Sequence, residues 1–269
     1  MRGPTDSKNL VDATGTRHVP AADARIVSLV PSITELLCEL GLVHLLVGRT
    51  GFCIHPETQV HAIAKVGGTK SVNLAKIRAL APTHVIVNID ENEKSTVAAI
   101  AEFVPHIVVT HPVRAEDNLA LFRLMGELFG AQAAAESLCE RFIRALAGLT
   151  AQQWPTLRVA YLIWKDPWMT VTPQTYIGHM LSLIGWHQIA IAGAKRYPVV
   201  DLAAVAPNVD ALLLSSEPYR FGSRDQDDLA QVYPGKRVLL LDGEMLSWYG
   251  SRAILALAYL QQIGHAAQS

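Results

Sequence analysis

The chain is poor in cysteine and in charged residues. Its three cysteines, Cys38, Cys53 and Cys139, form no CxxC pair, and an odd number cannot close a disulfide framework. A structural zinc site and a disulfide scaffold are therefore excluded. The charged fraction is 17% and the formal net charge is −1, so the chain lacks the basic surface that nucleic-acid binding requires.

Long apolar runs are also missing. The most apolar early stretch, residues 40–47, is far shorter than a membrane span, and residues 1–24 contain no apolar signal core. From the sequence as written we expect no membrane anchor. If the chain is complete, we expect a cytoplasmic protein; if a signal has been removed, a periplasmic location stays open.

Motifs for common enzymatic chemistry are absent too. The sequence has no GxSxG, no GxxxxGK[ST], no GxGxxG after a strand and no HExxH. Ser28, Ser32 and His55 could be combined into a nucleophilic site, but nothing in their spacing fixes such a geometry. The ten histidines are scattered without metal-ligand spacing. We therefore predict a non-catalytic protein that requires no cofactor and has no metal site.

What the chain does contain is one long amphipathic segment near its middle, residues 131–153. Apolar residues recur there at three- and four-residue steps, as on one face of a helix: Ala135, Leu138, Cys139, Phe142, Ile143, Leu146 and Leu149. Roughly 22 residues at 1.5 Å each give a helix about 33 Å long. The pattern fits either a rigid helix joining two lobes or an ordinary crossover helix inside one domain.

Strands and helices alternate on both sides of this segment. Short apolar runs predict buried strands at residues 25–30, 45–48, 84–88, 107–110, 158–164, 211–215 and 238–241. Ser32 and Glu35 have the spacing of a capping box for a helix over residues 33–40. The predicted fold is α/β, with two Rossmann-like lobes (residues 1–130 and 154–269), mostly parallel sheets and a linking helix over residues 131–153.

Large aromatic residues follow several predicted strands. In parallel α/β sheets ligands bind outside the carboxyl ends of the strands, where aromatic rings can stack on a flat or bulky ligand. Some of these rings could instead pack beneath the loops. The aromatic residues at these positions are Phe52, Trp164, Trp168, Tyr197, Tyr219, Trp248 and Tyr249.

Several motifs resemble those of vitamin B12-binding, BtuF-like proteins, which belong to the helical-backbone substrate-binding proteins of ABC importers. The opening resemblance is the segment Arg25–Ser32 followed by Thr34-Glu35 and Leu40-Gly41. Further motifs continue it in order along nearly the whole chain: Val47-Gly48, Lys65-Val66-Gly67-Gly68, Asn73-Leu74 and Leu80-Ala81-Pro82. The resemblance implies two α/β lobes joined by one long helix, with a ligand held between the lobes and no chemistry performed on it.

This resemblance implies a cobalamin-like corrinoid as ligand. Two positions depart from the best-known member of the family, because Thr69 and Asn88 stand where that member has tryptophans. The residues that we expect to contact the ligand are Phe52, Trp164, Asp166, Trp168, Tyr197, Trp248, Tyr249 and Arg252. Arg252 could instead cap or brace the last helix.

A second departure concerns a transporter partner. Exported members dock on an ABC permease through one glutamate on each lobe, and those positions fall at Ala75 and near Ala203 here. We expect a monomer that binds a small molecule and no nucleic acid. Whether an ABC permease is a partner stays open. The alternatives are a siderophore, haem or metal receptor, and a cytoplasmic enzyme or carrier acting on a corrinoid precursor through Cys53 and His55.

Overall fold

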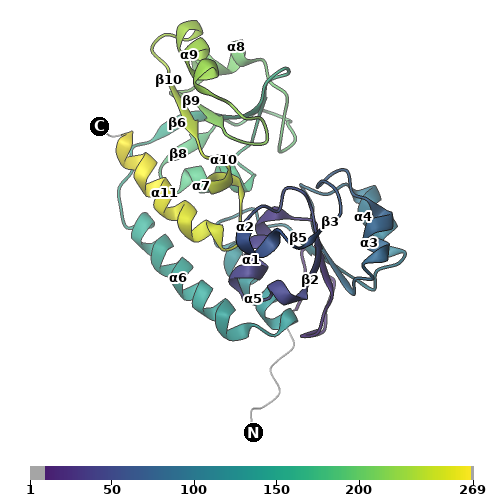
Figure 1. Ribbon diagram of the computed structural model, residues 1–269. Coiled ribbons are helices and arrows are strands. Elements are labelled where there is room, and N and C mark those ends of the chain that lie inside the picture. The colour runs from purple at the N-terminus through teal and green to yellow at the C-terminus, as the bar shows by residue number, and fades with distance from the viewer. Residues whose placement is uncertain (1–9, 268–269) are drawn as a thin grey trace. The chain divides into compact units, whose positions relative to one another are not determined.

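A computed structural model describes residues 10–267 of the protein (Figure 1). Residues 1–9 and 268–269, which include the start of the expected N-terminal lobe, lie outside the described residues. Contacts divide the chain into two compact units, which we call the first lobe and the second lobe. Of the described residues, the first comprises 10–112, 116–142 and 249–252, and the second comprises 113–115, 143–248 and 253–267.

The first lobe is built on a five-stranded parallel sheet in the order β3-β2-β1-β4-β5. Its strands are β1 (Ile26–Ser28), β2 (Leu46–Arg49), β3 (Ala64–Lys65), β4 (His84–Asn88) and β5 (His106–Thr110). Its helices are α1 (Pro31–Glu39), α2 (Glu57–Val60), α3 (Leu74–Ala79), α4 (Lys94–Ala101) and α5 (Asp117–Phe129), with a 3₁₀ turn at Val43–Leu45. The sheet is entirely parallel, as predicted.

Alternation along the central strands explains how this sheet is covered on both faces. Val85 and Val87 of β4 pack in one core with Ile77 of α3 and Ile100 of α4. Ile86, between them, points to the opposite face because side chains alternate along a strand. All five residues of β4 are buried, which is why the strand appears in the sequence as an unbroken apolar run.

The second lobe has a mixed five-stranded sheet. β10, β9 and β6 lie side by side in parallel, β8 pairs with β6 in parallel, and β7 pairs with β6 antiparallel. The strands are β6 (Leu157–Trp164), β7 (Met169–Thr170), β8 (Trp186–Gln188), β9 (Ala211–Ser215) and β10 (Arg237–Leu241). The helices are α7 (Tyr176–Ser182), α8 (Leu202–Val205), α9 (Ser223–Val232), α10 (Gly243–Ser247) and α11 (Arg252–Ala266), with a 3₁₀ turn at Ala206–Asn208. The prediction of two α/β lobes with mostly parallel sheets is confirmed.

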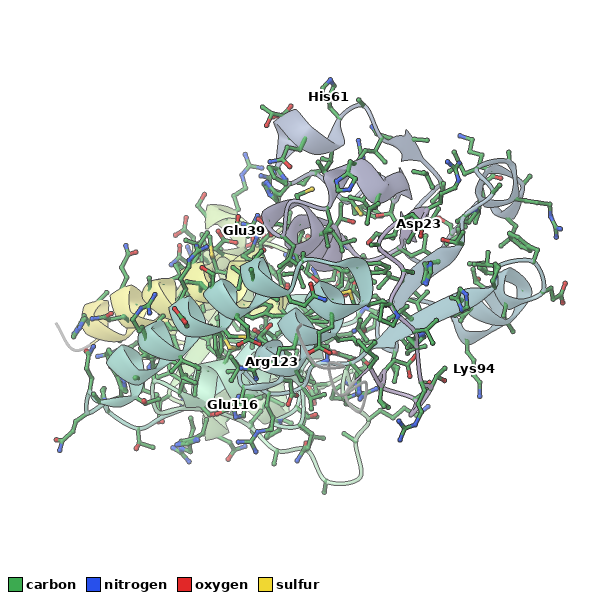
Figure 2. The ribbon with its side chains drawn as sticks, turned by 90° about the horizontal axis from the view of Figure 1, so that it is seen from below. Asp23, Glu39, His61, Lys94, Glu116 and Arg123 are labelled. Carbon is green, nitrogen blue, oxygen red and sulfur yellow. The ribbon has the colours of Figure 1, made fainter. Side chains whose placement is uncertain are left out.

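The predicted linking helix is α6 (Gln132–Thr150). Its 19 residues span about 28 Å at 1.5 Å per residue. Residues up to Phe142 belong to the first lobe and those from Ile143 to the second, so the boundary between the two units falls inside this helix. In the first lobe, exposed ion pairs from Arg123 to Glu136 and from Arg141 to Glu39 tie α6 to α5 and α1. Arg123 and Glu39 are labelled in Figure 2.

Two local predictions are wrong. Ile143 is 49% exposed, although its spacing placed it on the apolar face of the long helix. The predicted capping box at Ser32 does not form, because α1 already begins at Pro31 and its N-cap is Val30, with no side-chain cap. Proline is favoured at the first helical position, and Ser32 therefore lies inside the helix.

In residues 10–267, no helix is both long and apolar enough to cross a membrane.

Candidate functional site

The loop after β2 presents Phe52 to solvent. Phe52 is 61% exposed, yet the backbone that carries it is firmly anchored. The anchor is the buried Arg49 side chain, which donates to the backbone carbonyls of Val60 at 2.7 Å, Thr50 at 3.1 Å and Cys53 at 3.0 Å. An exposed aromatic ring on a fixed loop is a preorganised surface on which a ligand can stack.

A glycine loop lies directly beside the Phe52 ring. The Gly51 amide donates to the Gly67 carbonyl at 2.7 Å, and Asn92 Nδ2 donates to the Thr69 carbonyl at 2.9 Å. A Cβ atom added at Gly68 would lie 3.3 Å from the Phe52 ring. The absence of a side chain at this glycine lets the ring lie over the loop, so Phe52 and residues 67–69 form one patch.

Cys53 follows Phe52 but is fully buried. Its Sγ lies 3.1 Å from the hydroxyl oxygens of both Thr34 and Thr50. Burial raises the pKa of the Cys53 thiol, against the lowering effect of these hydrogen bonds. A buried thiol with a raised pKa is a poor nucleophile, and this argues against the corrinoid-processing enzyme with Cys53 as its first suspect.

The ends of β4 and β5 carry a second group of polar residues. Asn88 is buried and its Oδ1 accepts a hydrogen bond from the Asp90 amide at 2.8 Å. His111 Nε2 lies 3.5 Å from Asp90 Oδ2, and both side chains are 20% exposed. Ile89, which lies between Asn88 and Asp90 in the sequence, is 44% exposed. This edge of the sheet therefore combines an apolar side chain with an imidazole–carboxylate pair.

Tyr249 and Arg252, two of the residues expected to contact a ligand, are buried in the first lobe. The Tyr249 hydroxyl donates to Glu91 Oε1 at 2.7 Å. Burial, and to a smaller extent the negative charge of Glu91, raises the pKa of Tyr249 well above its usual value. Arg252 is 8% exposed and pairs with both carboxylate oxygens of Glu35. This pairing braces the start of α11, the alternative role considered for Arg252.

In the second lobe the loops after β6 and β9 bring two expected residues together. Trp164 is 40% exposed and meets Tyr219 edge to face, with ring centroids 5.7 Å apart. Trp168 stacks parallel on Phe221 at 5.9 Å, and Tyr219 and Phe221 are themselves 4.6 Å apart. We call these four residues the aromatic ledge. Tyr219 was among the aromatic residues noted after the predicted strands but not among the expected ligand contacts. Phe221 was not selected from the sequence, although its loop follows the predicted strand at residues 211–215.

Asp166 and Tyr197 lie near this ledge in the sequence but differ in environment. Asp166 is exposed and adopts a left-handed backbone conformation with φ +57°, which aspartate tolerates better than most residues. Its neighbour Lys165 pairs with Asp225 at 2.7 Å. Tyr197 is half-buried in the segment between β8 and α8.

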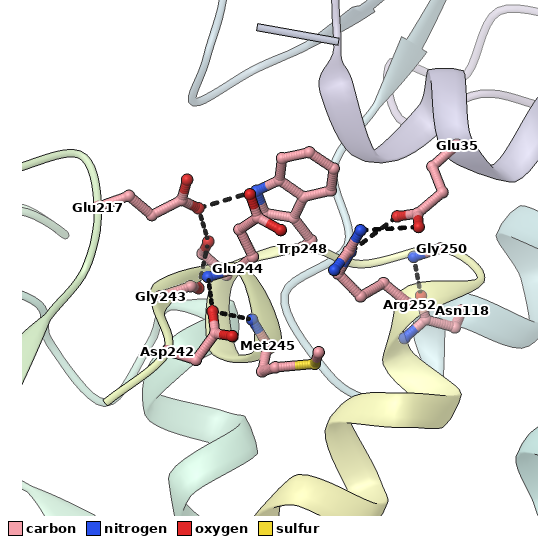
Figure 3. A network of polar contacts seen from close by, with 11 residues as sticks. Glu35, Asn118, Glu217, Asp242, Gly243, Glu244, Met245, Trp248, Gly250 and Arg252 are labelled. Carbon is pink, nitrogen blue, oxygen red and sulfur yellow. Dashed lines mark hydrogen bonds and ion pairs between the residues drawn. The ribbon is translucent and has the colours of Figure 1, made fainter. Parts of the chain in front are cut away.

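Trp248 is buried and points its indole N–H toward a carboxylate that sequence reasoning missed. Trp248 Nε1 donates to Glu217 Oε1 at 2.8 Å, and the Ser247 hydroxyl donates to the same oxygen at 2.7 Å (Figure 3). A Cβ atom at Gly243 would meet Glu217 Cγ at 2.6 Å, so only glycine allows Glu217 to lie there. The one feature of the sequence that could have indicated Glu217 is its position two residues after the end of a buried strand.

No group of three or more histidine, cysteine, aspartate or glutamate side chains in residues 10–267 is arranged to hold a metal ion. The described residues place aromatic rings and a few fixed polar groups at the carboxyl ends of parallel strands. A family model described as periplasmic binding protein matches residues 26–232 of the chain. The chain belongs to this family.

Similar proteins share the fold along nearly the whole chain. The vitamin B12-binding protein of Photorhabdus laumondii is 25% identical over 248 residues, which cover 90% of this chain and 88% of the relative. The periplasmic vitamin B12-binding protein BtuF of Vibrio cholerae is 21% identical with a TM-score of 0.73, covering 92% of this chain and 99% of BtuF. The periplasmic heme-binding protein RhuT from Roseiflexus sp. RS-1 is 23% identical with a TM-score of 0.77, covering 92% and 100%.

These findings confirm the resemblance to BtuF-like substrate-binding proteins. The protein is therefore a ligand-binding protein and not an enzyme. The relatives are named for different ligands, vitamin B12 in two cases and heme in the third, so the family fixes the type of protein and not its ligand.

Proposed function

We propose that the protein binds a cobalamin-like corrinoid, without chemical conversion, through aromatic residues of its strand-end loops. The observation that carries the proposal is the aromatic ledge, where an exposed Trp164 is held edge to face on Tyr219. A corrinoid is a broad macrocycle with flat apolar faces, and aromatic rings supply large contact areas to such a ligand at a low cost in side-chain entropy.

Phe52 supplies the corresponding aromatic surface in the first lobe. It is more exposed than Trp164, and the Arg49 hydrogen bonds fix the backbone of its loop. An exposed ring of this size contributes little to folding. Its burial against a ligand favours binding by roughly 25 cal/mol for each Å² removed from water. The kinship with a vitamin B12-binding protein at 25% identity points to the same ligand class.

Heme is the second candidate, favoured by the His111–Asp90 pair. Imidazole is a common axial ligand of heme iron, and a carboxylate that accepts a hydrogen bond from the other ring nitrogen typically orients such a ligand. At the end of β5, His111 Nε2 lies 3.5 Å from Asp90 Oδ2, so a carboxylate stands close enough to orient the imidazole. If heme is the ligand, ferric heme should give a shifted Soret band that is lost in His111→Ala. Corrinoid affinity should be the same in that variant.

The proposal is tested by removing aromatic surface from each lobe separately. Phe52→Ala and the double variant Trp164→Ala/Trp168→Ala should each weaken cobalamin binding by roughly tenfold or more. Both variants should remain folded. Leu255→Ala is the matched control, because Leu255 is 56% exposed on α11 and lies outside the strand-end loops. Binding is measured by equilibrium dialysis with detection of corrinoid absorbance. Wild-type affinity in both aromatic variants would refute the proposed binding surface.

A transporter partner remains a separate proposal. Ala75 on α3 and Ala203 on α8 are both exposed, so neither lobe offers a carboxylate at the position where the resemblance implies a docking glutamate. Charged pairs at such contacts govern association and partner choice. We therefore propose ligand binding that does not depend on docking through these two positions.

A further inference from the structure

Glu217 is oriented from both its backbone and its side chain. It follows β9, an interior strand of the second sheet, by two residues. Its backbone amide donates to the Ser215 hydroxyl oxygen at 3.2 Å, and the Ser215 hydroxyl donates to its carbonyl at 2.5 Å. Ser215 is in turn held by the buried Tyr161 hydroxyl at 2.8 Å. A glutamate held this rigidly has a fixed direction at the carboxyl end of the strand.

Only one of its two carboxylate oxygens is used. Oε1 accepts the hydrogen bonds from Ser247 and Trp248, as the dashed lines in Figure 3 show. In the part of the chain that the structure describes, no hydrogen bond reaches Oε2. Oε2 is also not one of the fully buried polar atoms, so it is accessible from outside the protein. Glu217 therefore presents one open acceptor at the ligand-facing end of the sheet.

The surroundings of this acceptor are negative. The charged groups that act most on Glu217 are Glu244 and Asp242, which follow β10, and both raise its pKa after the larger effect of burial. Asp166 stands exposed at the end of β6, the strand on the other side of β9. Of the nearby cations, Lys165 is neutralised by its pairing with Asp225, whereas Arg220 is exposed in the loop after Glu217.

We propose that Glu217 is a specificity-determining residue that selects macrocycles with carboxamide edges over macrocycles with carboxylate edges. The inference rests on the proposed function and names the ligand class within it. An amide N–H of the ligand donates to Oε2, and a charge-assisted hydrogen bond of this kind is stronger than one between neutral groups. A ligand carboxylate has no donor to offer and meets a like charge instead, which disfavours the wrong ligand.

Glu217→Gln is the informative variant. The glutamine amide oxygen can accept from Ser247 and Trp248 as Oε1 does, so the orientation of the side chain is kept. At the position of Oε2 it places an NH₂ group, which donates to a carboxylate and no longer accepts from an amide. Glu102→Gln is the matched control, because Glu102 is exposed at the end of α4 and lies outside the strand-end loops.

The experiment measures dissociation constants for two pairs of probes that differ in peripheral charge. The corrinoid pair is dicyanocobinamide and cobyrinic acid, and the porphyrin pair is the heme derivative with both propionates converted to carboxamides and heme itself. For the wild type, the dissociation constant of the carboxylate member should exceed that of its uncharged partner. Glu217→Gln should reduce this ratio by about tenfold, and Glu102→Gln should leave it unchanged.

The outcomes separate the two proposals. If the wild type binds the corrinoid pair and the ratio is the same in Glu217→Gln, the role of Glu217 is refuted and corrinoid binding stands. If only the porphyrin pair binds and the ratio shifts, the role of Glu217 is supported and the ligand is a porphyrin. If neither pair binds to the wild type, both proposals fail.

Discussion

Arg252 and Glu35 form a two-pronged ion pair across 217 positions of sequence, with Nε and Nη2 each 2.8 Å from a carboxylate oxygen. The side chains of Arg252 and Glu35 are only 8% and 17% exposed. The pair fixes the first turn of α11 to α1 within the first lobe. Glu35 is thus committed to a distant arginine and not to the cap of its own helix.

Two glutamates one turn apart on α1 provide a matched test of this pair. Glu35→Gln removes the carboxylate charge that pairs with the buried Arg252 and should lower the free energy of unfolding by about 3 kcal/mol. Glu39→Gln breaks the ion pair with Arg141, in which the Arg141 side chain is 47% exposed and the Glu39 side chain 43%. It should lower the free energy of unfolding by less than about 1 kcal/mol. Urea unfolding of both variants measures the difference. Equal losses would show that burial does not govern the strength of these pairs.

Acid should destabilise the first lobe through His84. His84 is 3% exposed and stacks on His106, and burial, followed by the charges of His106 and His18, lowers its pKa to about 4. The unfolded chain takes up this proton near pH 6.5, so stability is full above that pH. It is lost as the pH falls toward 4, by at most about 1.4 kcal/mol per pH unit.

His84→Phe removes this titration, and the exposed His61→Gln serves as the control. Free energies of unfolding in urea, measured between pH 7 and pH 4.5, should fall less steeply in His84→Phe than in the wild type. The slope of His61→Gln should match that of the wild type. A slope in His84→Phe equal to that of the wild type would assign the acid sensitivity to other groups.

Glu217 should have the opposite pH dependence. Its pKa is raised, mainly by burial, so the folded state disfavours its ionised form. Stability is therefore greatest below the unfolded pKa of about 4.5 and declines as the pH rises through the folded pKa. Glu217→Gln should match the wild type near pH 4 and be more stable than the wild type at pH 7.5. Thermal unfolding at the two pH values measures this, and a variant less stable by the same amount at both would contradict it.

Most of the fold could be predicted because buried parallel strands appear in the sequence as short apolar runs. β4 and β9 were predicted with the bounds that they have, and both are buried at every position. α9 was missed because its sequence is almost entirely polar and only one of its residues, Leu229, is buried. Ile143 shows the opposite error, since periodicity identifies a helix face but not where along it a packing partner ends.

The site was less accessible to sequence reasoning. Phe52 and Trp164 were expected to contact a ligand; both are exposed, and their role as ligand contacts stays a prediction. Tyr249 and Arg252 were selected for their residue type, and both hydroxyl and guanidinium engage carboxylates of the first lobe. Glu217 was missed because its importance lies in partners 30 and 31 residues away, Ser247 and Trp248.

The central claim is that this chain binds a corrinoid. The most direct test titrates the purified wild-type protein with cobalamin, cobinamide and heme, following the quenching of tryptophan fluorescence. We predict saturable quenching by cobalamin or cobinamide at a stoichiometry of about one, with clearly weaker quenching by heme. Saturable quenching by heme alone, or no response to any of the three, would contradict the account.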